Sequence, residues 1–467
     1  MTFRPDERFD VVVVGARCAG SPLAALLARR GLKVAVVEQA TFPRDTLSTH
    51  LLAADGLAFL DRLGVLDRVR ATGAPITSTI DLRLGDLRAL VEVPDREGDA
   101  GAGVCVRRFV LDPILAEAAA EAGADVRMGT RVTGLLERDG RVSGVRIVSD
   151  GSETRLRARL VVGADGRRST VASLCRARRF NVVPNERGYY WSYFEGVDAA
   201  HHDTLVYHRW DDRFVIGNPT DSGLYMVLTS PRRGEADSFR RAPDASLLGH
   251  AMAYEPIASR LSGARKAART FGVVRFQGFF REASGPGWAL AGDAGHFKDP
   301  VVGRGIGDAF LQAGTLAPAI ERGLDGSGDG LDAELERWGR WRDREFAETY
   351  WIAEMYGAAR PLPDLVPEIA RRLCARGRGG EVVEVPSHRR QPSSVFTVRR
   401  TMAATGRLLV RRRGDLAVLR EARDLGLREL RNRRLNARPV YEPPAEAPPA
   451  GVASRDSALD PNELVSP

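Results

Sequence analysis

The chain has 467 residues, of which 43% are hydrophobic and 28% charged, and these fractions exclude a fibrous or wholly disordered protein. This length exceeds what one compact core usually supports, so we expect two interleaved domains followed by a tail. The net charge of +8 is carried mostly by arginine, and much of it lies after residue 360. A basic tail accounts for that charge, and we expect no nucleic-acid partner.

Cysteine usage and hydropathy indicate a reduced, cytoplasmic protein. The four cysteines lie far apart in the chain and form no CxxC or Cys/His spacing, which argues against a disulfide framework and against a zinc site. The pair His201-His202 is interpreted as a solvated turn, so no metal site is predicted. No stretch approaches ~20 apolar residues, so we expect neither a signal peptide nor a membrane span.

A strand, a glycine-rich turn, a helix and a second strand are predicted at residues 11–14, 15–20, 21–30 and 33–37. This is the pattern of a βαβ unit, in which backbone N–H groups at the helix start can bind a dinucleotide pyrophosphate. Between Gly15 and Gly20, Arg17 occupies the second glycine position of GxGxxG, and its guanidinium can pair with phosphates instead. Glu38 closes the second strand and can accept hydrogen bonds from both hydroxyls of an adenosine ribose.

The next part of the chain alternates loops, helices and short strands. Residues 40–50 are expected to form a loop, and residues 53–63 and 110–122 helices. Three short strands at 126–128, 131–137 and 141–148 are interpreted as a small antiparallel meander, and 160–166 as a strand of the parallel type. That strand ends in Asp165-Gly166, a carboxylate and turn suited to holding a ribose or phosphate edge, although the same pair also forms plain turns.

A second sheet, antiparallel, is predicted between residues 180 and 280. Its strands are the aromatic segments 189–194, 204–210, 214–217, 224–229 and 271–278. By the two-residue period of a strand, Tyr189, Trp191 and Tyr193 share one face, and Tyr207 and Arg209 do so on the neighbouring strand. One such face should line the substrate cavity, and the sequence leaves open which one.

The chain then returns to the first domain and continues into helices. A strand at 288–291 leads through a glycine-rich loop into a helix at 305–320. The later aromatic residues with helical spacing are interpreted as a core-facing stripe: Trp338, Trp341, Phe346, Tyr350 and Trp351. Residues 395–436 form another Arg-rich helical region, and the Pro/Ala-rich segment 439–467 is expected to be disordered.

The glycine-rich loop has residues suited to a flat ring system that carries a polyol chain. Asp293 can hold a polyol hydroxyl, and Pro300, Gly303 and Gly305 follow it ahead of the helix. Bare glycine backbone lets a flat ring system lie against the chain. The partial positive charge at the helix start near Gly305 would stabilise the negative charge of a reduced flavin.

The three motifs, in this order and spacing, resemble the FAD-dependent monooxygenase superfamily with the para-hydroxybenzoate hydroxylase fold, in its geranylgeranyl-reductase-like branch. The resemblance covers residues 8–355, and its most specific stretches are GARCAGSPLA, TFPRDTLSTH, RRFVLD, ADGRRS and GDAGHFKDPVVGRGIGDAF. It implies an α/β fold in which a Rossmann-type FAD-binding domain is interleaved with an antiparallel-sheet substrate domain, an α+β insert, before a helical C-terminal region. The corresponding segments are 1–180 and 281–330 for FAD, 181–280 for the substrate, 331–438 for the helices and 439–467 for the tail.

The resemblance also implies the residues that bind FAD. Gly15, Gly20 and Glu38 should hold the ADP part, Arg107 or Arg108 the pyrophosphate and ribityl region, Asp293 the ribityl chain, and Gly303 and Gly305 the pyrimidine edge. The full predicted set is Gly15, Arg17, Gly20, Glu38, Arg44, Arg107, Asp165, Asp293, Pro300, Gly303 and Gly305. Three positions depart from the family pattern, namely Arg17, Ala172 in place of an arginine, and Asp308 in place of an asparagine. The second departure argues against direct nicotinamide binding at the Asp-Gly motif, and the sequence leaves open whether the enzyme is self-sufficient or receives its electrons from a separate flavin reductase.

The candidate catalytic residues are His50, His296, Tyr193 and Arg209, with Lys298 close to His296 in the sequence. In this family the loop that contains His50 lies near the isoalloxazine, although a histidine there could equally cap the next helix. The activity implied by the resemblance is hydroxylation or epoxidation of a small aromatic or polyketide-like metabolite. It proceeds through a flavin C4a-hydroperoxide formed from O2 with electrons from NADPH or NADH.

Three alternatives stay open from the sequence. One is an FAD-dependent reductase of C–C double bonds, as in the prenyl-reductase relatives. Another is a flavin halogenase, although the Trp-x-Trp-x-Ile-Pro signature of that class is absent and Tyr190-Trp191-Ser192-Tyr193 does not replace it. The third is a regulatory protein that keeps FAD as a structural ligand while the Arg-rich region after Val395 contacts a membrane surface or a partner.

Overall fold

The first sheet is the core of the nucleotide-binding part, in a computed structural model that describes residues 6–46, 48–326 and 328–443. Its strands lie in the order β19-β20-β10-β1-β2-β7. Their bounds are β1 Glu7–Val14, β2 Val34–Val37, β7 Asp125–Arg127, β10 Ser152–Gly163, β19 Ser284–Gly285 and β20 Trp288–Leu290. The central strands pair in parallel, with Val11 opposite both Leu160 and Val34. Because helices cover one face and a meander the other, these strands are apolar on both sides.

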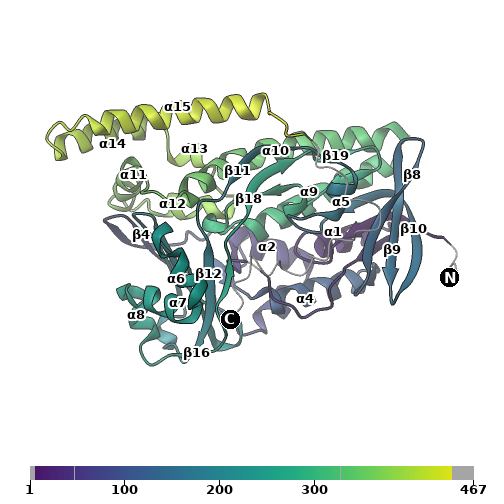
Figure 1. The fold of residues 1–467 in the computed structure, drawn as a ribbon, viewed down its shortest axis with the longest axis horizontal. Coiled ribbons are helices and arrows are strands. Elements are labelled where there is room, and N and C mark those ends of the chain that lie inside the picture. The colour runs from purple at the N-terminus through teal and green to yellow at the C-terminus, as the bar shows by residue number, and fades with distance from the viewer. Residues whose placement is uncertain (1–5, 47, 327, 444–467) are drawn as a thin grey trace.

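The predicted βαβ unit is confirmed, and so is the Rossmann-type fold class. Helices α1 (Gly20–Ala28), α4 (Arg108–Glu121) and α9 (Gly305–Asp325) pack on one face of the sheet. Figure 1 shows them together beside the sheet, with the meander at the right-hand side of the view. Shorter elements join these parts: β3 Leu51–Ala53, β6 Gly103–Cys105, α2 Ala54–Leu63, α3 Leu66–Arg70 and α5 Thr170–Leu174.

The meander differs from the prediction in its first strand. Strands β8 (Arg131–Arg138) and β9 (Arg141–Ser149) are antiparallel, and β9 pairs with the first half of β10. Strand β7, predicted as part of this meander, instead pairs in parallel with β2. Since α4 precedes β7 and returns the chain to the same edge of the sheet, β7 completes a right-handed crossover rather than a hairpin. A strand of only three residues, Asp-Val-Arg, has no pattern that identifies its partner.

The second sheet contains more of the chain than predicted. Its order is β16-β12-β15-β14-β13-β4-β5, with β17 also paired to β12. The bounds are β4 Thr79–Leu84, β5 Leu87–Glu92, β12 Tyr189–Glu195, β13 Thr204–Trp210, β14 Arg213–Pro219, β15 Leu224–Ser230, β16 Arg265–Lys266 and β17 Phe271–Val273. The hairpin β4–β5 comes from within residues 1–180, and β4 pairs with β13 in parallel. The sheet is therefore mixed rather than wholly antiparallel.

The segment 271–278, predicted as one strand, is divided between two sheets. Strand β17 ends at Val273, and β18 (Gln277–Arg281) joins β11 (Arg179–Pro184) and β21 (His296–Phe297) in a three-stranded sheet. The side chain of Asn185 holds the bend between them, because its Oδ1 accepts the N–H of Phe276 at 2.8 Å and its Nδ2 donates to the carbonyl of Val274 at 3.1 Å.

The two faces of the second sheet have different neighbours, which answers the question that the sequence left open. Tyr189, Trp191 and Tyr193 face inward and pack in one cluster with Phe297 and Val301 of the glycine-rich loop. The opposite face is covered by α6 (Ala236–Arg241), α7 (Pro243–Met252) and α8 (Glu255–Leu261). The Tyr189 face is therefore the one directed at the first domain.

The rest of the described chain is helical. The bounds are α10 Gly328–Gly357, α11 Leu365–Cys374, α12 Gly380–Val383, α13 Pro392–Val395, α14 Val398–Arg411 and α15 Ala417–Ala437. The predicted aromatic stripe of α10 is confirmed, since Trp338, Phe346, Tyr350 and Trp351 are buried and Trp341 is partly buried. Helices α14 and α15 run along one edge of the molecule (Figure 1). Most of the predicted tail, residues 444–467, lies outside the described residues.

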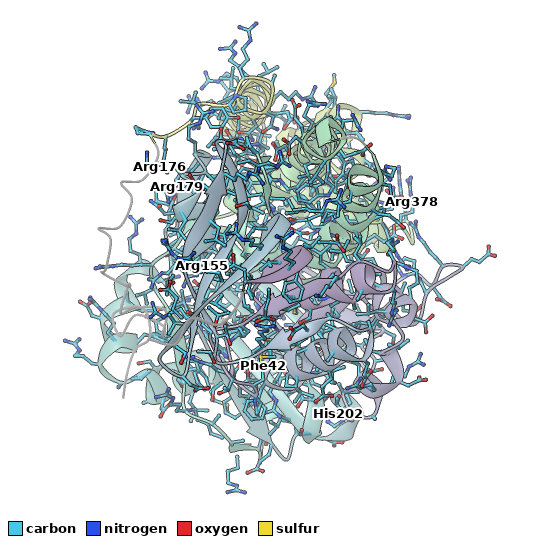
Figure 2. All side chains as sticks on the ribbon, turned by 90° about the vertical axis from the view of Figure 1, so that its right-hand side faces the viewer. Phe42, Arg155, Arg176, Arg179, His202 and Arg378 are labelled. Atoms are coloured by element: carbon cyan, nitrogen blue, oxygen red, sulfur yellow. The ribbon has the colours of Figure 1, made fainter. Side chains whose placement is uncertain are left out.

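The described end of the chain returns to the three-stranded sheet. Tyr441 forms a bridge with Phe180, and Arg179 pairs with Glu442 at 2.8 Å. Figure 2 shows Arg179 and its neighbour Arg176 on the flank beneath α15. Among the described residues, no helix combines the length and apolar character needed to cross a bilayer.

Candidate functional site

The turn after β1 is shaped by its two glycines. Gly15 has a φ of +103°, and a Cβ there or at Gly20 would overlap the carbonyl oxygen of Ala164 or of Gly15, respectively. These glycines therefore let the turn pack against the end of β10. No side chain caps the start of α1, so the N–H groups of its first turn remain suited to a phosphate.

The Glu38 carboxylate lies beside this turn. One of its oxygens accepts the N–H of Ala16 and the other the N–H of Ala40, both at 3.0 Å. It therefore fixes the turn from the end of β2, where a ribose would meet it. Arg17 pairs with the fully buried Asp112 at 2.9 Å, which holds the guanidinium at the helix start.

The two consecutive arginines before α4 have different partners, and this differs from the predicted role of Arg107. The Arg107 guanidinium binds the buried Asp221 with 2.6 and 2.9 Å hydrogen bonds, between the first domain and the β14–β15 turn. Arg108 instead binds Asp112 at 2.6 and 3.0 Å, next to Arg17. The structure thus brings Arg108, the other candidate, to the Gly15 turn.

The Asp293 loop reaches the same place. Gly292 has a φ of +60°, and a Cβ there would lie 2.7 Å from the Cβ of Ala19 at the start of α1. Burial raises the pKa of Asp293, while the neighbouring Lys298, Arg108 and Arg167 act in the opposite direction. The carboxylate predicted for the ribityl chain is therefore next to the arginine of the Gly15 turn.

The Asp165 carboxylate has a structural role that the sequence did not specify. It accepts the N–H groups of Thr170 and Val171 at 2.7 and 3.2 Å and the hydroxyl of Ser169 at 2.5 Å. These bonds cap α5, with Ser169 also accepting the N–H of Ala172 at 2.9 Å. The plain-turn interpretation of Asp-Gly therefore fits the structure better than a ligand-holding carboxylate.

The predicted ring-binding loop is built on a tight turn. Pro300 opens a 3₁₀ turn whose start is capped by Asp299, and Gly303 follows with a φ of +66°. A Cβ at Gly303 would lie 3.2 Å from Leu51, whereas a Cβ at Gly305 would meet nothing within 4 Å. No side chain caps α9. The start of α9 thus offers bare backbone and open space, as a flavin ring requires.

His50 and Tyr193, both predicted as catalytic, are in direct contact. Tyr193 Oη lies 2.8 Å from His50 Nε2 and donates to Asp45 Oδ2 at 3.1 Å. His50 Nδ1 accepts the N–H of Arg108 at 3.3 Å. The imidazole is therefore neutral with its proton on Nε2, so a chain of hydrogen bonds runs from His50 through Tyr193 to Asp45.

The electrostatics agree with this arrangement. Burial, and then the charge of Arg108, lower the pKa of His50 to about 3. Burial also raises the pKa of Asp45 and the pKa of Tyr193. Asp45 was missed by the sequence interpretation, which selected its exposed neighbour Arg44. The cofactor role of Arg44 stays a prediction.

His296 is placed differently from the prediction. It is buried against Phe280 and Phe346, with ring centroids 4.3 and 5.2 Å away, on the side of α10. Burial lowers its pKa well below the usual value, so it is a neutral core side chain. Its packing against Phe346 attaches the loop to α10.

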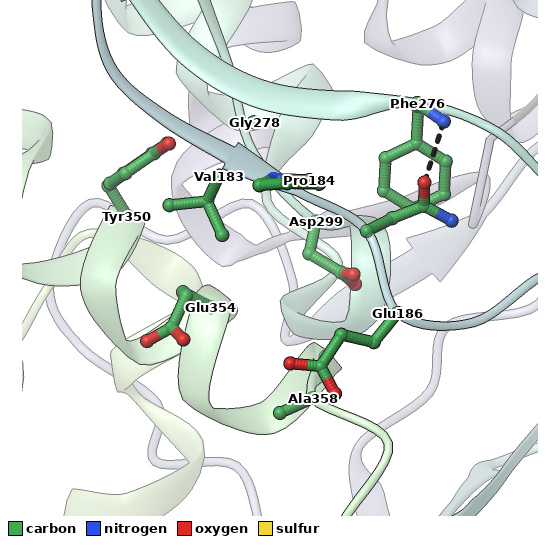
Figure 3. A pocket seen from close by; sticks show the side chains of 11 residues that line it. Val183, Pro184, Glu186, Phe276, Gly278, Asp299, Tyr350, Glu354 and Ala358 are labelled. Carbon is green, nitrogen blue, oxygen red and sulfur yellow. Dashed lines mark hydrogen bonds between the residues drawn. The ribbon is translucent and has the colours of Figure 1, made fainter.

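Arg209 is also placed differently from the prediction, because it caps the end of α10. Its guanidinium donates to the carbonyls of Tyr356, Ala358 and Arg360 at 3.2, 3.0 and 2.5 Å. A cation there stabilises the carbonyl end of the helix. The adjoining pocket in Figure 3, lined by Asp299, Glu354 and Ala358, has a volume of about 30 Å³. That is room for water rather than for a substrate.

A buried charge cluster at the first turn of α9 surrounds Asp308. Its carboxylate contacts Lys298 and lies 2.7 Å from His388 Nε2 and 3.5 Å from Arg304 Nε. Burial, and then Arg304, lower the pKa of Lys298. The sequence marked Asp308 as a departure from the family pattern but gave no signal for His388, which lies 80 residues further along the chain.

The pair His201-His202, interpreted from the sequence as a solvated turn, lies at the end of a short helical turn. His201 ends a 3₁₀ turn and His202 follows it, in the lower part of the view in Figure 2. Within residues 6–443 as described, no group of His, Cys, Asp and Glu side chains could hold a metal ion.

FAD fits the residues that converge at the two helix starts. The uncapped N-terminus of α1, with Arg17, Arg108 and Glu38, suits the ADP part, and Asp293 lies beside it. The open space at Gly305 suits a planar ring. The individual assignments of these residues to parts of the cofactor remain predictions.

Comparison with known proteins supports an FAD-binding chain. The FAD binding domain family matches residues 8–240. Digeranylgeranylglycerophospholipid reductase of Methanosarcina mazei is 29% identical over 354 residues, which are 72% of this chain and 81% of the reductase. Menaquinone reductase of Mycolicibacterium smegmatis is 32% identical over 340 residues, which are 68% of this chain and 76% of the reductase.

Solved structures show the same fold at lower identity. The myxobacterial chondrochloren halogenase CndH has a TM-score of 0.67 at 22% identity, covering 85% of this chain and 97% of the halogenase. Aklavinone-11 hydroxylase, solved with FAD and aklavinone, has a TM-score of 0.61 at 21% identity, covering 78% of this chain and 71% of the hydroxylase. With the matching family, the related reductases and a site that fits FAD, the chain belongs to the FAD-dependent oxidoreductase superfamily and is an FAD-binding enzyme.

Proposed function

We propose that this enzyme is a cytoplasmic FAD-dependent monooxygenase that hydroxylates or epoxidises a small aromatic or polyketide-like molecule with O2, using electrons from NADH or NADPH. The observation that supports this most directly is the state of the titratable groups on the inner sheet face. His50, Tyr193 and Asp45 satisfy one another, with contacts of 2.8 and 3.1 Å. In this chain of hydrogen bonds each proton is already donated to a neighbouring residue of the protein.

This arrangement suits oxygen transfer better than reduction of a double bond. Adding hydrogen across a C–C bond requires a hydride and a protein group that gives a proton to the second carbon. Oxygen transfer asks the protein mainly to exclude water and to position the substrate. The locked His50–Tyr193 pair provides rigidity rather than a mobile proton.

The inner face supplies the dry wall that oxygen transfer needs. Trp191 stacks on Phe271 with ring centroids 5.5 Å apart, and Tyr193 meets the same ring edge-on. Phe276 and Phe297 extend this aromatic surface to the glycine-rich loop. Such a wall favours an apolar substrate and disfavours water.

The cofactor would supply the redox chemistry, and the protein backbone would stabilise the charge that develops on it. Bound FAD would supply the two-electron chemistry with oxygen. The uncapped first turn of α9 would stabilise negative charge at the edge of a ring lying against Gly305. Asp293 and Arg108 would orient the chain that connects the two halves of the cofactor.

The Asp-Gly loop supports delivery of electrons by a separate flavin reductase. Asp165 and Ser169 are used to cap α5, and the position of the family's arginine is the buried Ala172. These side chains are therefore not free to bind a nicotinamide dinucleotide.

Reduction of C–C double bonds is the second candidate, and one observation favours it. Two related proteins that are 29% and 32% identical to this chain are reductases. The halogenase alternative has the support of the shared fold and of one related brominase that is 23% identical to this chain.

Single-turnover reactions under labelled oxygen would separate the two candidates. Enzyme with reduced FAD is mixed with an aromatic polyketide or a polyprenyl quinone, either under ¹⁸O₂ or in the absence of oxygen. The masses of the products are then measured by mass spectrometry. We expect oxygen-dependent product that carries the label. Product that gains two hydrogens in the absence of oxygen would refute the monooxygenase and establish the reductase. Tyr193→Phe is the matched variant, and it should keep FAD binding while uncoupling product formation from flavin oxidation.

A further inference from the structure

The last two described helices form an outer layer, the Arg–Leu hairpin, defined as residues 398–438. Its inner side is attached to the body by Ala404 and Leu408 of α14 and Val418 of α15, which pack with Leu365 and Ile369 of α11. In Figure 1 the hairpin runs along the upper edge of the molecule, with its other side turned away from the body. It is therefore an attached element with a free outer surface.

Exposed apolar side chains lie in rows along that outer surface. On α15, Leu419, Leu427 and Leu430 are 46%, 57% and 64% exposed, and their spacing of eight and three residues places them on one helix face. The face opposite contains Val418 and Asn432, both buried. Three further exposed apolar residues follow one side of α14: Val398, Met402 and Val410. The leucines thus form a stripe that no other described residue covers.

The stripe is surrounded by positive charge. Residues 398–441 contain thirteen arginines and four acidic residues, an excess larger than the net charge of +8 of the whole chain. Several of the arginines are neutralised locally, such as Arg411 by Glu368. Six are exposed and have no ion-pair partner among the described residues: Arg399, Arg413, Arg420, Arg431, Arg434 and Arg438. On α15, Arg420, Arg431 and Arg434 flank the leucine stripe.

We propose that the Arg–Leu hairpin binds the surface of an anionic phospholipid bilayer. A helix with leucines on one face and arginines beside them lies in the plane of a membrane, with the apolar side chains among the acyl chains and the guanidinium groups at the phosphates. Both components gain from such a surface, since each arginine near anionic lipid adds attraction and each buried leucine adds hydrophobic free energy.

Other binding partners would match either the leucines or the arginines of this surface, but not both. A second copy of the hairpin would cover the leucines but would bring two strongly positive segments together. A nucleic acid would pair with the arginines but would leave the leucines in water. The proposal does not depend on the reaction that the enzyme performs.

Vesicle sedimentation with the full-length, FAD-loaded protein tests the proposal. The probes are vesicles of pure phosphatidylcholine and vesicles of equimolar phosphatidylcholine and phosphatidylglycerol, at low and at physiological salt. We expect binding to the anionic vesicles that weakens with salt, and little binding to the neutral ones. The triple variant Arg420→Gln, Arg431→Gln, Arg434→Gln should bind anionic vesicles roughly tenfold more weakly or worse.

Two further variants separate the contributions. Leu419→Gln with Leu427→Gln should lower binding by roughly tenfold at physiological salt, where charge attraction is screened. The matched control, Arg240→Gln with Arg241→Gln on α6, removes exposed arginines remote from the hairpin and should bind like the wild type. FAD content and melting temperature show that each variant is folded.

Three results would overturn the proposal. Equal binding to neutral and anionic vesicles would remove the role of charge, and an equal loss in the α6 control would remove the role of the hairpin. A protein that ignores both kinds of vesicle but sediments as a dimer, and becomes a monomer in the leucine variant, would show that a second copy covers the stripe.

Discussion

Arg107 and Arg108 are adjacent in the chain, yet the structure assigns them different tasks, and replacing each with glutamine separates these tasks. Arg107 is the cation of a pair whose acid, Asp221, is completely buried. After Arg107→Gln the carboxylate keeps the backbone N–H of residue 107 at 2.8 Å and the hydroxyl of Thr220 at 3.1 Å, but it loses its guanidinium. Breaking a buried pair from one side costs about 3–5 kcal/mol. Because these hydrogen bonds remain, we expect the free energy of unfolding to fall by an amount near the lower end of this range, about 3 kcal/mol.

Arg108→Gln should behave in the opposite way. Its acid, Asp112, still pairs with Arg17 at 2.9 Å after the change, so the free energy of unfolding should fall by only about 1 kcal/mol. If Arg108 contacts the pyrophosphate of FAD, the affinity should fall about tenfold to a hundredfold, because a hydrogen bond to a charged group contributes about 1.5–3 kcal/mol.

The assay measures both quantities for both variants. Urea unfolding of the FAD-free protein gives stability without the contribution of bound ligand, and quenching of flavin fluorescence gives affinity. We expect Arg107→Gln to lose stability and to keep FAD affinity within about threefold of the wild type once folded. Arg107→Gln that unfolds like the wild type but binds FAD at least tenfold more weakly would refute the assignment.

The pH dependence offers an internal check on the same pair. The bonds from Arg107 lower the pKa of Asp221 below its usual 3.8, although burial acts in the opposite direction. A carboxyl whose folded pKa is lowered adds stability above its unfolded pKa and loses it as the pH falls through the folded pKa. The difference in stability between wild type and Arg107→Gln should therefore be constant near neutral pH and shrink as acid protonates the Asp221 carboxylate.

Further predictions address the ring site, the hydrogen-bond chain and a buried acid. Gly305→Ala should fold like the wild type, since its Cβ meets nothing within 4 Å, but it should weaken FAD binding. Gly303→Ala should instead lose about 1 kcal/mol of stability, because residue 303 has a φ of +66°. Flavin titration and thermal melting distinguish the two variants. Tyr193→Phe leaves His50 Nε2 without its partner and should cost about 1–3 kcal/mol, measured by urea unfolding. Burial raises the pKa of Asp55 to about 6, so its contribution to stability is complete below about pH 4 and lost as the pH rises through 6. Asp55→Asn should therefore be less sensitive to pH in this range, and an unchanged pH profile would contradict the burial argument.

The elements that the sequence predicted well are those whose pattern is local. The βαβ unit could be recognised because a run of valines, a glycine turn and a helix of period 3.6 follow one another without interruption. The residues that share a face of the second sheet with Trp191 could also be identified from the two-residue period of a strand. Which face looks inward could not be decided, because that depends on where α6 to α8 pack. Strand β7 was misassigned for the same reason, since its partner is chosen by the preceding helix.

Among the site residues, those fixed by backbone geometry were easier to predict than those fixed by side-chain contacts. Gly15 and Gly303 were selected from their glycine-rich motifs, and both have positive φ values. Asp45 and His388 gave no signal, because each acts through a partner far away in the sequence. Arg209 was chosen from its strand position, but its position opposite the end of α10 is a property of the folded chain alone.

The departures from the family motif are accompanied by compensating contacts, which argues that they belong to a working site. Arg17, where a glycine is usual, is held by Asp112 together with Arg108, so the lost backbone freedom is exchanged for two guanidinium groups at one helix start. Asp308, where an asparagine is usual, sits among Lys298, Arg304 and His388. An asparagine there would leave buried cations without a carboxylate, at a cost of several kcal/mol. Asp308→Asn should therefore destabilise this chain although it restores the family residue, and combining it with Lys298→Met should recover part of the loss. A single variant as stable as the wild type in urea would mean that the cluster is neutralised in some other way.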